Sequence, residues 1–496
     1  MPCLPPSGAP LPLFGREATR RIEQRAQATV PHFTLMGRAG AAVARLALAV
    51  APHARRIWVA AGPGNNGGDG LEAATLLRQA GLNVTVTLLA APEALPADAA
   101  RAWQRAVDSG VSVSDEFPAP LGAGDLIIDA VFGVGVTREP AGPSAALVRF
   151  IAAQAAPVLA VDLPSGLDGD TGQPFGALCV HARHTLSLLT LKPGLFTGAG
   201  RDHAGRVWFD DLGTSPGDES PQAELPVPPR PAALRHAQHK GSFGDVLVVG
   251  GSAGMAGAAI LAARAAHAAG AGRVLVDLLD PAGLTHDPVR PELMLRAGAR
   301  LGDLPEQATV VAGCGGGDAI AAALPRLLGM APRLVLDADA LNAIAADSTL
   351  QALLAARASS GREAVLTPHP LEAARLLGSS AAAVQADRLS AARALVDRFG
   401  AVVVLKGSGS VVAAPARPPL INPTGNAALA TAGTGDVLAG WVGGLWSASG
   451  TGALEAARAG TWTHGEAADN ACHAPLRAAD LIEAMHAAAA RARPLD

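Results

Sequence analysis

Short apolar runs recur along the whole chain, and most of them end at glycine or at a polar side chain. In the first half they predict buried strands at residues 57–61, 83–89, 126–130, 158–161, 185–191 and 206–209. Apolar residues at helical spacing predict a helix over residues 13–50, broken near Pro31, and further helices at 71–79, 97–108 and 143–154. Strands that alternate with helices indicate a parallel sheet with helices on both faces.

The same pattern restarts in the second half of the chain. Predicted strands lie at residues 245–249, 309–312, 334–336, 364–366 and 402–405. Between the halves, residues 214–233 are rich in proline and lack periodicity, which is typical of a linker. We therefore predict an α/β protein of two three-layer αβα domains, with the first domain at residues 1–215, a linker at 216–232 and the second domain at 233–496.

Composition excludes several classes of partner. Of the 496 residues, 49% are hydrophobic and 17% are charged, so large cores can form, and the net charge of −4 argues against nucleic acid or an anionic membrane as a partner. The four cysteines are scattered, with no pair at zinc spacing, which favours a reducing compartment. The proline-rich start lacks the basic residues of a signal peptide, and no window of about 20 residues is apolar enough to span a bilayer. We predict a cytoplasmic protein.

A glycine-rich turn follows the first strand of the first domain. Residues 62–70 read Gly-Pro-Gly-Asn-Asn-Gly-Gly-Asp-Gly, which would place amides and small polar side chains at the end of the strand. The spacing matches G-x-G-x-x-G, but no acidic residue follows the second strand, which argues against an ordinary dinucleotide site. Later strands end at Asp129 and near Asp162 and Ser165. Because parallel strands end at one edge of a sheet, we expect one polar site, although each residue alone could serve a structural turn.

The second domain carries similar turns. Residues 250–258, Gly-Gly-Ser-Ala-Gly-Met-Ala-Gly-Ala, open a helix and would form a cradle of amides that suits an anion. Later strands lead to Thr-Pro-His-Pro-Leu-Glu at 367–372 and to Lys-Gly-Ser-Gly-Ser at 406–410. Lysine occurs only at positions 192, 240 and 406, so surface decoration explains these three residues poorly.

The sequence Gly-Thr-Gly-Asp at residues 433–436 leads into an apolar run that predicts a helix. The amides of Gly433, Thr434 and Gly435 would lie at the positive end of that helix, where an anion binds. A carboxylate in the first turn repels an anion, so the placement of Asp436 needs a reason. The functional interpretation is a general base that takes a proton from a hydroxyl attacking a phosphoryl group, and the structural alternative is a capping residue of a glycine-rich turn.

Together and in this order, the motifs resemble those of the bifunctional NAD(P)H-hydrate repair enzymes, in which an epimerase domain is fused to an ADP-dependent (S)-NAD(P)H-hydrate dehydratase. Residues 64–70, Asp129 with the following Phe-Gly-Val-Gly, and residues 162–167 match the epimerase part, and the later motifs match the dehydratase part. The resemblance covers nearly the whole chain, and it implies a Rossmann-like first domain and a ribokinase-like second domain. One departure lies at residues 313–315, which read Gly-Cys-Gly where the family usually has Gly-Pro-Gly.

For the first domain, the resemblance implies interconversion of the R and S hydrates at the nicotinamide ring. The implied substrate contacts are Asn65, Asn66, Gly67, Gly68, Asp69, Gly133, Val134, Gly135, Val136, Thr137, Arg138, Glu139 and Asp162. A potassium ion is implied on Asn66, Asp129 and Ser165, whose oxygens suit a hard cation. Because cleavage and re-formation of the C–O bond need a proton carrier, we predict that Asp162 is the catalytic acid or base.

For the second domain, the resemblance implies that ADP phosphorylates a hydroxyl, a poor leaving group, which then departs as phosphate to leave AMP and NADH or NADPH. Asp436 would be the catalytic base, and the amides around it would stabilise negative charge. The implied substrate contacts are Ala258, Gly315, His369 and Asp436, and the implied nucleotide contacts are Lys406, Gly407, Ser408, Gly409, Ser410 and Gly435. A magnesium ion is expected with the ADP phosphates, and the sequence assigns it no ligands.

Two alternatives stay open at this point. A ribokinase-like kinase of a small molecule, such as a vitamin precursor, would use the same Gly-Thr-Gly-Asp, although the cradle at 250–258 and the first domain count against it. The first domain could also be a binding module without activity. On the favoured interpretation the partners are the hydrates of NADH and NADPH (NADHX and NADPHX) and ADP, and a homo-oligomer is left open.

Overall fold

The computed structural model describes residues 8–230, 233–280, 284–296, 298, 305, 307–449, 452–471 and 476–492. The chain divides into two compact units, Met1–Glu224 and Leu225–Asp496, and the division falls inside the predicted linker. That linker is not irregular throughout, because residues Ala223–Leu225 form the short strand β9. Two of the four cysteines, at positions 3 and 472, lie outside the described residues. The other two, Cys179 and Cys314, are buried and free.

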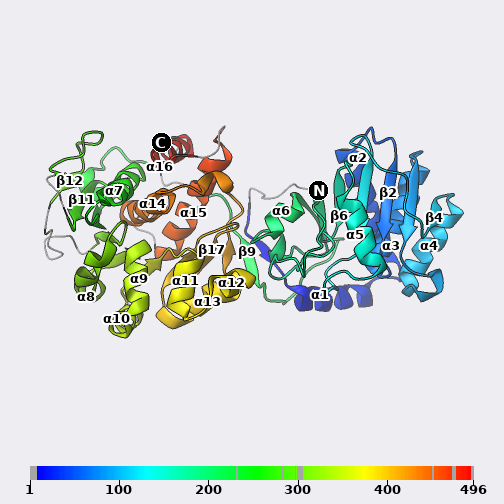
Figure 1. The fold of residues 1–496 in the computed structure, drawn as a ribbon, viewed down its shortest axis with the longest axis horizontal. Coiled ribbons are helices and arrows are strands. Elements are labelled where there is room, and N and C mark those ends of the chain that lie inside the picture. Colours follow the sequence, from blue (N-terminus) through cyan, green and yellow to red (C-terminus); the bar gives the residue numbers. More distant parts are fainter. Residues whose placement is uncertain are drawn as a thin grey trace. The chain divides into compact units, whose positions relative to one another are not determined.

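The first unit contains one parallel sheet (Figure 1). Its helices and strands are β1 (Leu11–Leu13), α1 (Arg16–Thr29), α2 (Thr34–Val50), β2 (Ile57–Ala61), α3 (Asn65–Gln79), β3 (Val84–Leu88), α4 (Ala97–Asp108), β4 (Ser112–Ser114), β5 (Leu126–Ala130), α5 (Pro143–Ala152), β6 (Val158–Val161), β7 (His184–Leu188), α6 (Gly200–Ala204) and β8 (Arg206–Asp210). The strand order is β4-β3-β2-β5-β6-β7-β8, and neighbouring strands are parallel.

Both faces of this sheet are covered, because β2 is apolar on both sides. Ile57, Val59 and Ala61 belong to a core shared with α2, α3 and α4. Trp58 and Ala60 point to the opposite face and belong to a core shared with α5. This is the period of two that a strand imposes on its side chains, and it produces the predicted three-layer arrangement.

The predicted elements of this unit are confirmed, with one correction. The break in the first helix falls between α1 and α2, and the predicted strands appear as β2, β3, β5, β6, β7 and β8. The helix predicted to begin at residue 71 begins instead at Asn65, so the glycine-rich run forms its first turns rather than a loop. Close packing explains why glycine is needed here: a Cβ at Gly67 would lie 2.0 Å from the carbonyl oxygen of Gly62.

The second unit also has a mainly parallel sheet. Its helices and strands are β10 (Asp245–Gly250), α7 (Ala256–Ala268), β11 (Arg273–Leu278), β12 (Met294–Leu295), β13 (Thr309–Ala312), α8 (Ile320–Met330), β14 (Arg333–Leu336), α9 (Ala338–Ala346), α10 (Ser348–Ser359), β15 (Ala364–Leu366), α11 (Pro370–Leu377), α12 (Ala381–Ala386), α13 (Arg388–Phe399), β16 (Val402–Leu405), β17 (Val411–Ala413), β18 (Leu420–Ile421), α14 (Thr434–Ser449), α15 (Ala453–Asp469) and α16 (Ala478–Ala492). The order is β18-β17-β16-β15-β14-β13-β10-β11-β12, parallel from β12 to β16 and antiparallel at β17 and β18.

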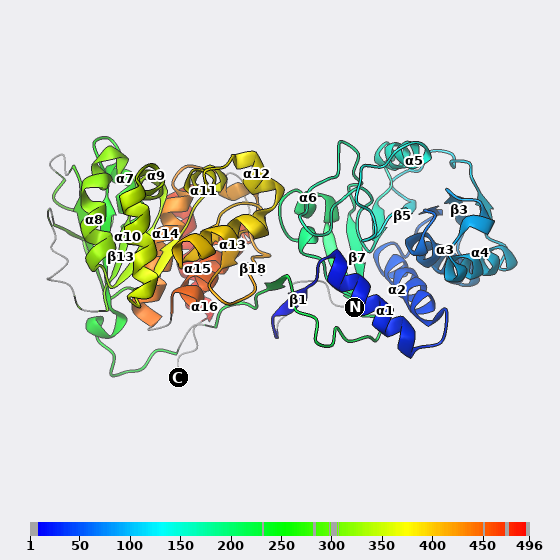
Figure 2. The same cartoon turned by 90° about the horizontal axis from the view of Figure 1, so that it is seen from below.

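Helices cover this second sheet on two sides (Figures 1 and 2). Helices α7, α14 and α15 share an apolar core with the strands, and α16 packs outside α7 and α14. Helices α8 to α13 gather on the other side. The five predicted strands of this half are confirmed as β10, β13, β14, β15 and β16, whereas β11, β12, β17 and β18 were not predicted.

Among the described residues, no single helix has the length and apolar character needed to cross a membrane. Helices α1 and α2 reach that length and apolar character only when they are counted as one segment, and the chain bends by 114° between them.

Candidate active sites

The first candidate site lies at the point where the strand order of the first sheet reverses. From β2 the chain adds β3 and β4 on one side and β5 to β8 on the other, so the carboxyl ends of β2 and β5 flank a switch point, where α/β proteins bind ligands. A cavity of about 410 Å³ opens there between α1, α2, the start of α3 and the loops after β5, β6 and β7. Its polar lining residues are Thr19, Arg20, Glu23, Gln27, Asn65, Asn66, Asp69, Asp98, Asp162 and Lys192.

Asp162, directly after β6, is the most constrained carboxylate of this cavity. It is buried and has a φ of 67°, a left-handed conformation that is uncommon outside glycine. One carboxylate oxygen accepts a hydrogen bond from the amide of Val134 at 3.0 Å, and the other accepts from the amide of Leu188 at 3.3 Å and pairs with Lys192. The lysine ammonium also donates to the carbonyl oxygens of Leu188 at 2.8 Å and Thr190 at 2.9 Å. A buried cation is thus fixed beside Asp162.

Two of the predicted potassium ligands, Asp129 and Ser165, are in contact, and the third, Asn66, lines the cavity. The carboxylate of Asp129 accepts hydrogen bonds from the hydroxyl of Ser165 at 2.6 Å and from its amide at 2.8 Å, and burial raises the pKa of Asp129 to about 6. Among the described residues, the buried side-chain nitrogen of Asn66 has no hydrogen-bond partner. That nitrogen is a donor and cannot bind a cation, whereas the carboxylate of Asp129, the hydroxyl of Ser165 and the side-chain oxygen of Asn66 are hard ligands of the type that suits a monovalent cation.

Burial raises the pKa values of two further acids of the cavity. Burial, followed by the charge of Asp162, raises the pKa of Asp69 well above its usual range. Burial, and again Asp162, raises the pKa of Glu23. Glu23 comes from α1, which the sequence did not connect with the site. Lys192 was likewise unassigned, although the rarity of lysine in the chain was a usable signal.

The structure brings most of the predicted contacts of the first domain to this cavity. Asn65, Asn66, Asp69, residues 133–136 and Asp162 line it. Gly67, Gly68 and residues 137–139 do not. A Cβ at Gly68 would meet the side chain of Met36 at 2.6 Å, so this glycine packs against a helix. Glu139 turns away and accepts a hydrogen bond from the amide of Ala177 at 2.9 Å.

The second candidate site lies at the equivalent position of the second sheet, between β10 and β13, where the strand order reverses. Two hydrogen bonds join the turns that follow these strands: the amide of Gly251 donates to Cys314 at 3.0 Å, and that of Ser252 donates to the carbonyl of Gly315 at 2.7 Å. A Cβ at Gly315 would lie 2.9 Å from the side chain of Ala258. The two predicted contacts Ala258 and Gly315 are therefore neighbours.

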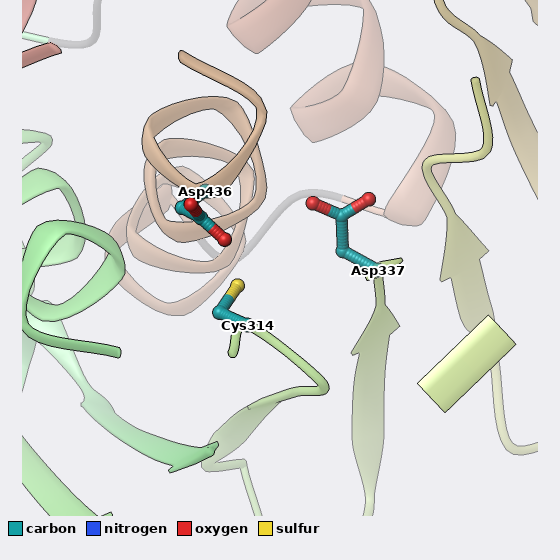
Figure 3. Close-up of side chains that lie close together, drawn as sticks. All are labelled: Cys314, Asp337 and Asp436. Atoms are coloured by element: carbon teal, nitrogen blue, oxygen red, sulfur yellow. The ribbon is translucent and has the colours of Figure 1, made fainter. Parts of the chain in front are cut away.

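Asp436 lies in the first turn of α14, as predicted, although this helix begins at Thr434 rather than at residue 437. Figure 3 shows its carboxylate facing Cys314, from the turn after β13, and Asp337, from the end of β14. The ligand atoms of these three residues lie within 4.8 Å of one another. Burial, followed by the charge of Asp337, raises the pKa of Asp436 to about 6, although a hydrogen bond from Cys314 and the charge of Lys406 oppose the rise.

The lysine near Asp436, Lys406, forms its ion pair with a different carboxylate, Asp337. The ammonium of Lys406 lies 2.7 Å from Asp337 and 4.0 Å from Glu372. Burial opposes the charge of this lysine, but the two carboxylates outweigh burial, and the pKa of Lys406 is raised. A Cβ at Gly435 would lie 3.3 Å from the same ammonium, so only a glycine leaves this space beside the helix terminus.

His369 joins the site through Glu372, which the sequence analysis did not single out. The pair forms a capping box at the start of α11: Nδ1 of His369 accepts the amides of Leu371 and Glu372, and the Glu372 carboxylate accepts the amide of His369 at 2.7 Å. Nε2 of His369 lies 3.2 Å from Glu372. Burial raises the pKa of Glu372 to about 7, against the lowering effect of Lys406. The predicted set of His369, Lys406 and Asp436 therefore belongs to one region.

The predicted nucleotide loop after β16 has a firmly held start. Gly407 has a φ of 141°, and a Cβ there would meet the guanidinium of Arg388 at 2.8 Å. Arg388 donates to the carbonyl oxygens of Leu405 and Lys406, and burial lowers its pKa to about 10. The hydroxyl of Ser410 donates back to the carbonyl of Gly407 at 3.1 Å. The loop is thus a preformed turn beside Lys406.

A thiol and two carboxylates are not the all-oxygen set that magnesium prefers. One of the carboxylates, Asp337, is also paired with Lys406. We therefore assign no metal to the cluster of Cys314, Asp337 and Asp436.

Two α/β units, each with acids, a lysine and glycine-rich turns at a switch point, define a two-site α/β enzyme. A family model described as NAD(P)H-hydrate dehydratase matches residues 246–488, and one described as YjeF-related protein N-terminus matches residues 32–194. The chain is 38% identical over 454 residues to the bifunctional NAD(P)H-hydrate repair enzyme of Escherichia coli K12, covering 88% of this chain and 85% of the relative. It is 37% identical over 479 residues to the bifunctional NAD(P)H-hydrate repair enzyme of Coxiella burnetii, and the match covers 92% of this chain and 94% of the relative.

Among solved structures, the chain is similar to an ADP/ATP-dependent NAD(P)H-hydrate dehydratase from Bacillus subtilis co-crystallised with ATP and Mg²⁺. The identity is 28%, the match covers 53% of this chain and 95% of the Bacillus chain, and the TM-score is 0.46. Because these relatives match the chain over most of its length, this chain belongs to the bifunctional NAD(P)H-hydrate repair enzymes. It is an NAD(P)H-hydrate epimerase and dehydratase, and this membership decides against the small-molecule kinase alternative.

Proposed function

We propose that the second unit dehydrates the S hydrate with ADP as phosphoryl donor and Asp436 as general base. The observation that carries this proposal is a carboxylate with a pKa of about 6 in the first turn of a helix. A base with that pKa is mostly unprotonated at neutral pH and still binds a proton readily enough to take one from a hydroxyl. The amides at the start of α14 then stabilise the negative charge that develops on the phosphoryl group.

The reaction has two balanced parts. The hydroxyl oxygen of the hydrate attacks the terminal phosphorus of ADP, its proton goes to Asp436, and the P–O bond to AMP breaks. The C–O bond to the new phosphate ester then breaks and phosphate departs with the bonding electrons. The adjacent ring carbon loses a proton, which departs with the phosphate or to water, and the ring double bond of NADH or NADPH forms again. Phosphate is a far better leaving group than hydroxide, which explains why a kinase-like fold can serve a dehydration.

We assign nucleotide binding to Lys406, Gly407, Ser408, Gly409, Ser410 and Gly435, and hydrate binding to Ala258, Gly315, His369 and Asp436. Two observations support this assignment: the turn after β16 is closed by the hydroxyl of Ser410, and the ammonium of Lys406 lies close to Gly435 at the start of α14. Magnesium, when bound, would neutralise charge on the ADP phosphates. The Bacillus dehydratase that was crystallised with ATP and Mg²⁺ is consistent with a nucleotide and a magnesium ion in this unit.

In the first unit we propose that Asp162 carries the proton during epimerisation. Lys192 pairs with this carboxylate and fixes it in the cavity wall, and the amide of Val134 holds its second oxygen. Asn66, Asp129 and Ser165 would hold a potassium ion, which would supply positive charge beneath the substrate loop. The remaining proposed contacts are Asn65, Gly67, Gly68, Asp69, Gly133, Val134, Gly135, Val136, Thr137, Arg138 and Glu139.

We further propose that the protein works in the cytoplasm on small molecules and has no nucleic-acid or membrane partner. The net charge of −4 supports this proposal, because neither polyanion is attracted to such a chain.

The direct test uses a mixture of R and S hydrates of NADH and follows recovery of the reduced-nicotinamide absorbance. With ADP and Mg²⁺, the full chain should restore all of the absorbance, because epimerisation feeds the dehydratase. Without ADP there should be no recovery. Recovery that stops when the S hydrate is exhausted would refute the epimerase activity, and a stable phosphate ester as the final product would refute the dehydration.

A further inference from the structure

Cys314 is a buried thiol at the centre of the second site, and its position is fixed by its backbone. It lies between Gly313 and Gly315, whose φ values of 111° and 60° give the turn after β13 a shape that few other residues adopt. Its carbonyl accepts the amide of Gly251 at 3.0 Å, which ties the turn to the end of β10. The side chain is fully buried. This turn therefore aims the thiol in one direction.

That direction is toward Asp436 (Figure 3). The sulfur and the carboxylate oxygens of Asp436 and Asp337 lie within 4.8 Å of one another, and the thiol shares a hydrogen bond with Asp436. Burial, followed by the two carboxylates, raises the pKa of the Cys314 thiol well above its usual range. The sulfur therefore keeps its proton and acts as a donor, not as an acceptor or a nucleophile.

We infer that Cys314 is a positioning residue for the dehydration step: its S–H donates to the Asp436 carboxylate, aims it at the substrate and favours its charged, basic form. This inference rests on the proposed role of Asp436 as the general base. The charge of Asp337 makes Asp436 harder to ionise, and the hydrogen bond from Cys314 opposes this effect. Because a thiol is a weak donor, it changes the basicity of Asp436 only moderately.

The other charged groups around Asp436 come from three elements. Asp337 precedes α9 and Asp339 lies in its first turn, and both disfavour the charged form of Asp436, while Lys406 after β16 favours it. On α15, His464 hydrogen-bonds the carbonyl of Thr434 at 2.9 Å, and burial lowers its pKa to about 4, so it is neutral at the pH of the assays. Lys406 also interacts electrostatically with Cys314, but a change at Cys314 leaves the identity of all these groups unchanged, so the thiol is the single residue varied in the test.

The test compares Cys314→Ser, Cys314→Ala and wild type in the dehydration of (S)-NADHX by the full chain with ADP and Mg²⁺, measured as kcat/KM from pH 5 to 8.5. A hydroxyl is a stronger donor than a thiol, so the acid limb of the serine variant should move about 0.5 pH unit lower. Alanine has no donor, so its acid limb should move about 0.5 pH unit higher, with kcat reduced about tenfold and KM little changed.

Cys179, the other buried cysteine of the described chain, provides the matched control. It lies in the first unit, so Cys179→Ser should leave the dehydration profile unchanged. A purely structural role for Cys314 predicts lower activity and stability in both variants with no displacement of the acid limb, and that result would overturn the inference. So would displacement of both variants in the same direction.

The Asp436→Asn background separates this inference from the proposed function. If Asp436→Asn keeps normal turnover, the general base is wrongly assigned and the role of Cys314 fails with it. If Asp436→Asn abolishes turnover while the pH profiles of both cysteine variants fall at the same acidic pH as the wild-type profile, Asp436 remains the general base and only the role of Cys314 is refuted. On our proposal, adding Cys314→Ala to Asp436→Asn changes the residual rate by less than about twofold, because the two residues act as a unit.

Discussion

The two sites hold their key carboxylates in opposite electrostatic settings. Asp162 of the first unit receives two backbone amides and the ammonium of Lys192, so its charge is fully compensated. Asp436 of the second unit has a carboxylate and a thiol as neighbours, and its pKa rises to about 6. The same residue type is therefore paired with a cation in one unit and lies beside a second carboxylate in the other.

The placement of lysine produces this difference. Each site contains one buried lysine, but Lys192 pairs with the proposed catalytic carboxylate, whereas Lys406 pairs with Asp337, the neighbour of the catalytic carboxylate. In the second unit the cation is left beside the helix terminus, where phosphate is expected, and Asp436 is free to change its protonation state. One site places its cation on the proposed proton carrier, and the other places it on a neighbour of the proposed base.

The largest effect should come from removing that base. We expect Asp436→Asn to lower the dehydration rate by about three orders of magnitude or more with ADP still bound, because an amide cannot accept the hydroxyl proton. Epimerisation by the same protein should stay normal, and an R/S ratio assay checks this. Near-normal dehydration would show that the two carboxylates do not differ as we argue.

A somewhat smaller effect should follow in the first unit from Lys192→Met. The change removes the cation that holds Asp162, so epimerisation should fall by about two orders of magnitude. It also leaves a buried carboxylate without its partner, which destabilises the unit by about 3 kcal/mol or more. The dehydration rate of the same variant reports whether the second unit remains intact, and Lys240→Met, at an exposed lysine, is the matched control. Unchanged epimerisation would contradict the pairing that we consider essential.

The sequence was sufficient to predict the layers and most of the strands, because strand-to-helix alternation and buried apolar runs depend on local pattern. It placed the start of α3 too late, since a run of glycine and asparagine normally indicates a loop. Here the glycines are helical because the backbone of Gly62 approaches them closely, a tertiary contact that local pattern does not encode.

The candidate sites were predictable to the extent that strand ends converge in a parallel sheet. That Asp129 and Ser165 meet follows from topology, because β5 and β6 are neighbours in the sheet. The ion pairs within the sites could not be predicted from topology. Lys406 pairs with Asp337 and not with Asp436, and this choice depends on side-chain distances of a few ångströms. The spacing of His369 and Glu372 is that of a capping box, which the sequence could have revealed. Nothing local in the sequence indicates that Glu372 is buried beside Lys406.

The pH dependence of dehydration should reveal the tuned base. The pKa of Asp436 is about 6, and the base acts only when unprotonated, so the rate should be level above about pH 7 and fall close to tenfold per pH unit well below 6. Glu372, with a pKa of about 7, also titrates in this range. The variant Glu372→Gln removes that second group, and the fall below pH 6 should persist in it. Initial rates between pH 5 and 8.5 measure both proteins, and a level profile in the glutamine variant would exclude Asp436 as the titrating base.

The smallest effect concerns stability and has the opposite sign to the loss of activity. The pKa of Asp436 rises from 3.8 to about 6 on folding, so its charged form costs stability above pH 6, and the cost disappears as the pH falls toward 4. Asp436→Asn removes a penalty of about 1–3 kcal/mol at pH 7.5. The Tm of the unit should therefore rise by roughly 3–6 °C.

At pH 4.5 the Tm difference should shrink to about a third of its value at pH 7.5, because the folded wild-type carboxyl is then protonated while the unfolded one, with its usual pKa of 3.8, is still largely ionised. Asp162→Asn, at a compensated carboxylate, should instead lower the Tm at pH 7.5, since it breaks the pair with Lys192. Calorimetry of the full chain without nucleotide measures all three proteins. If both asparagine variants shift the Tm in the same direction, the two carboxylates do not occupy opposite settings, and the contrast between a carboxylate paired with lysine and a tuned base fails.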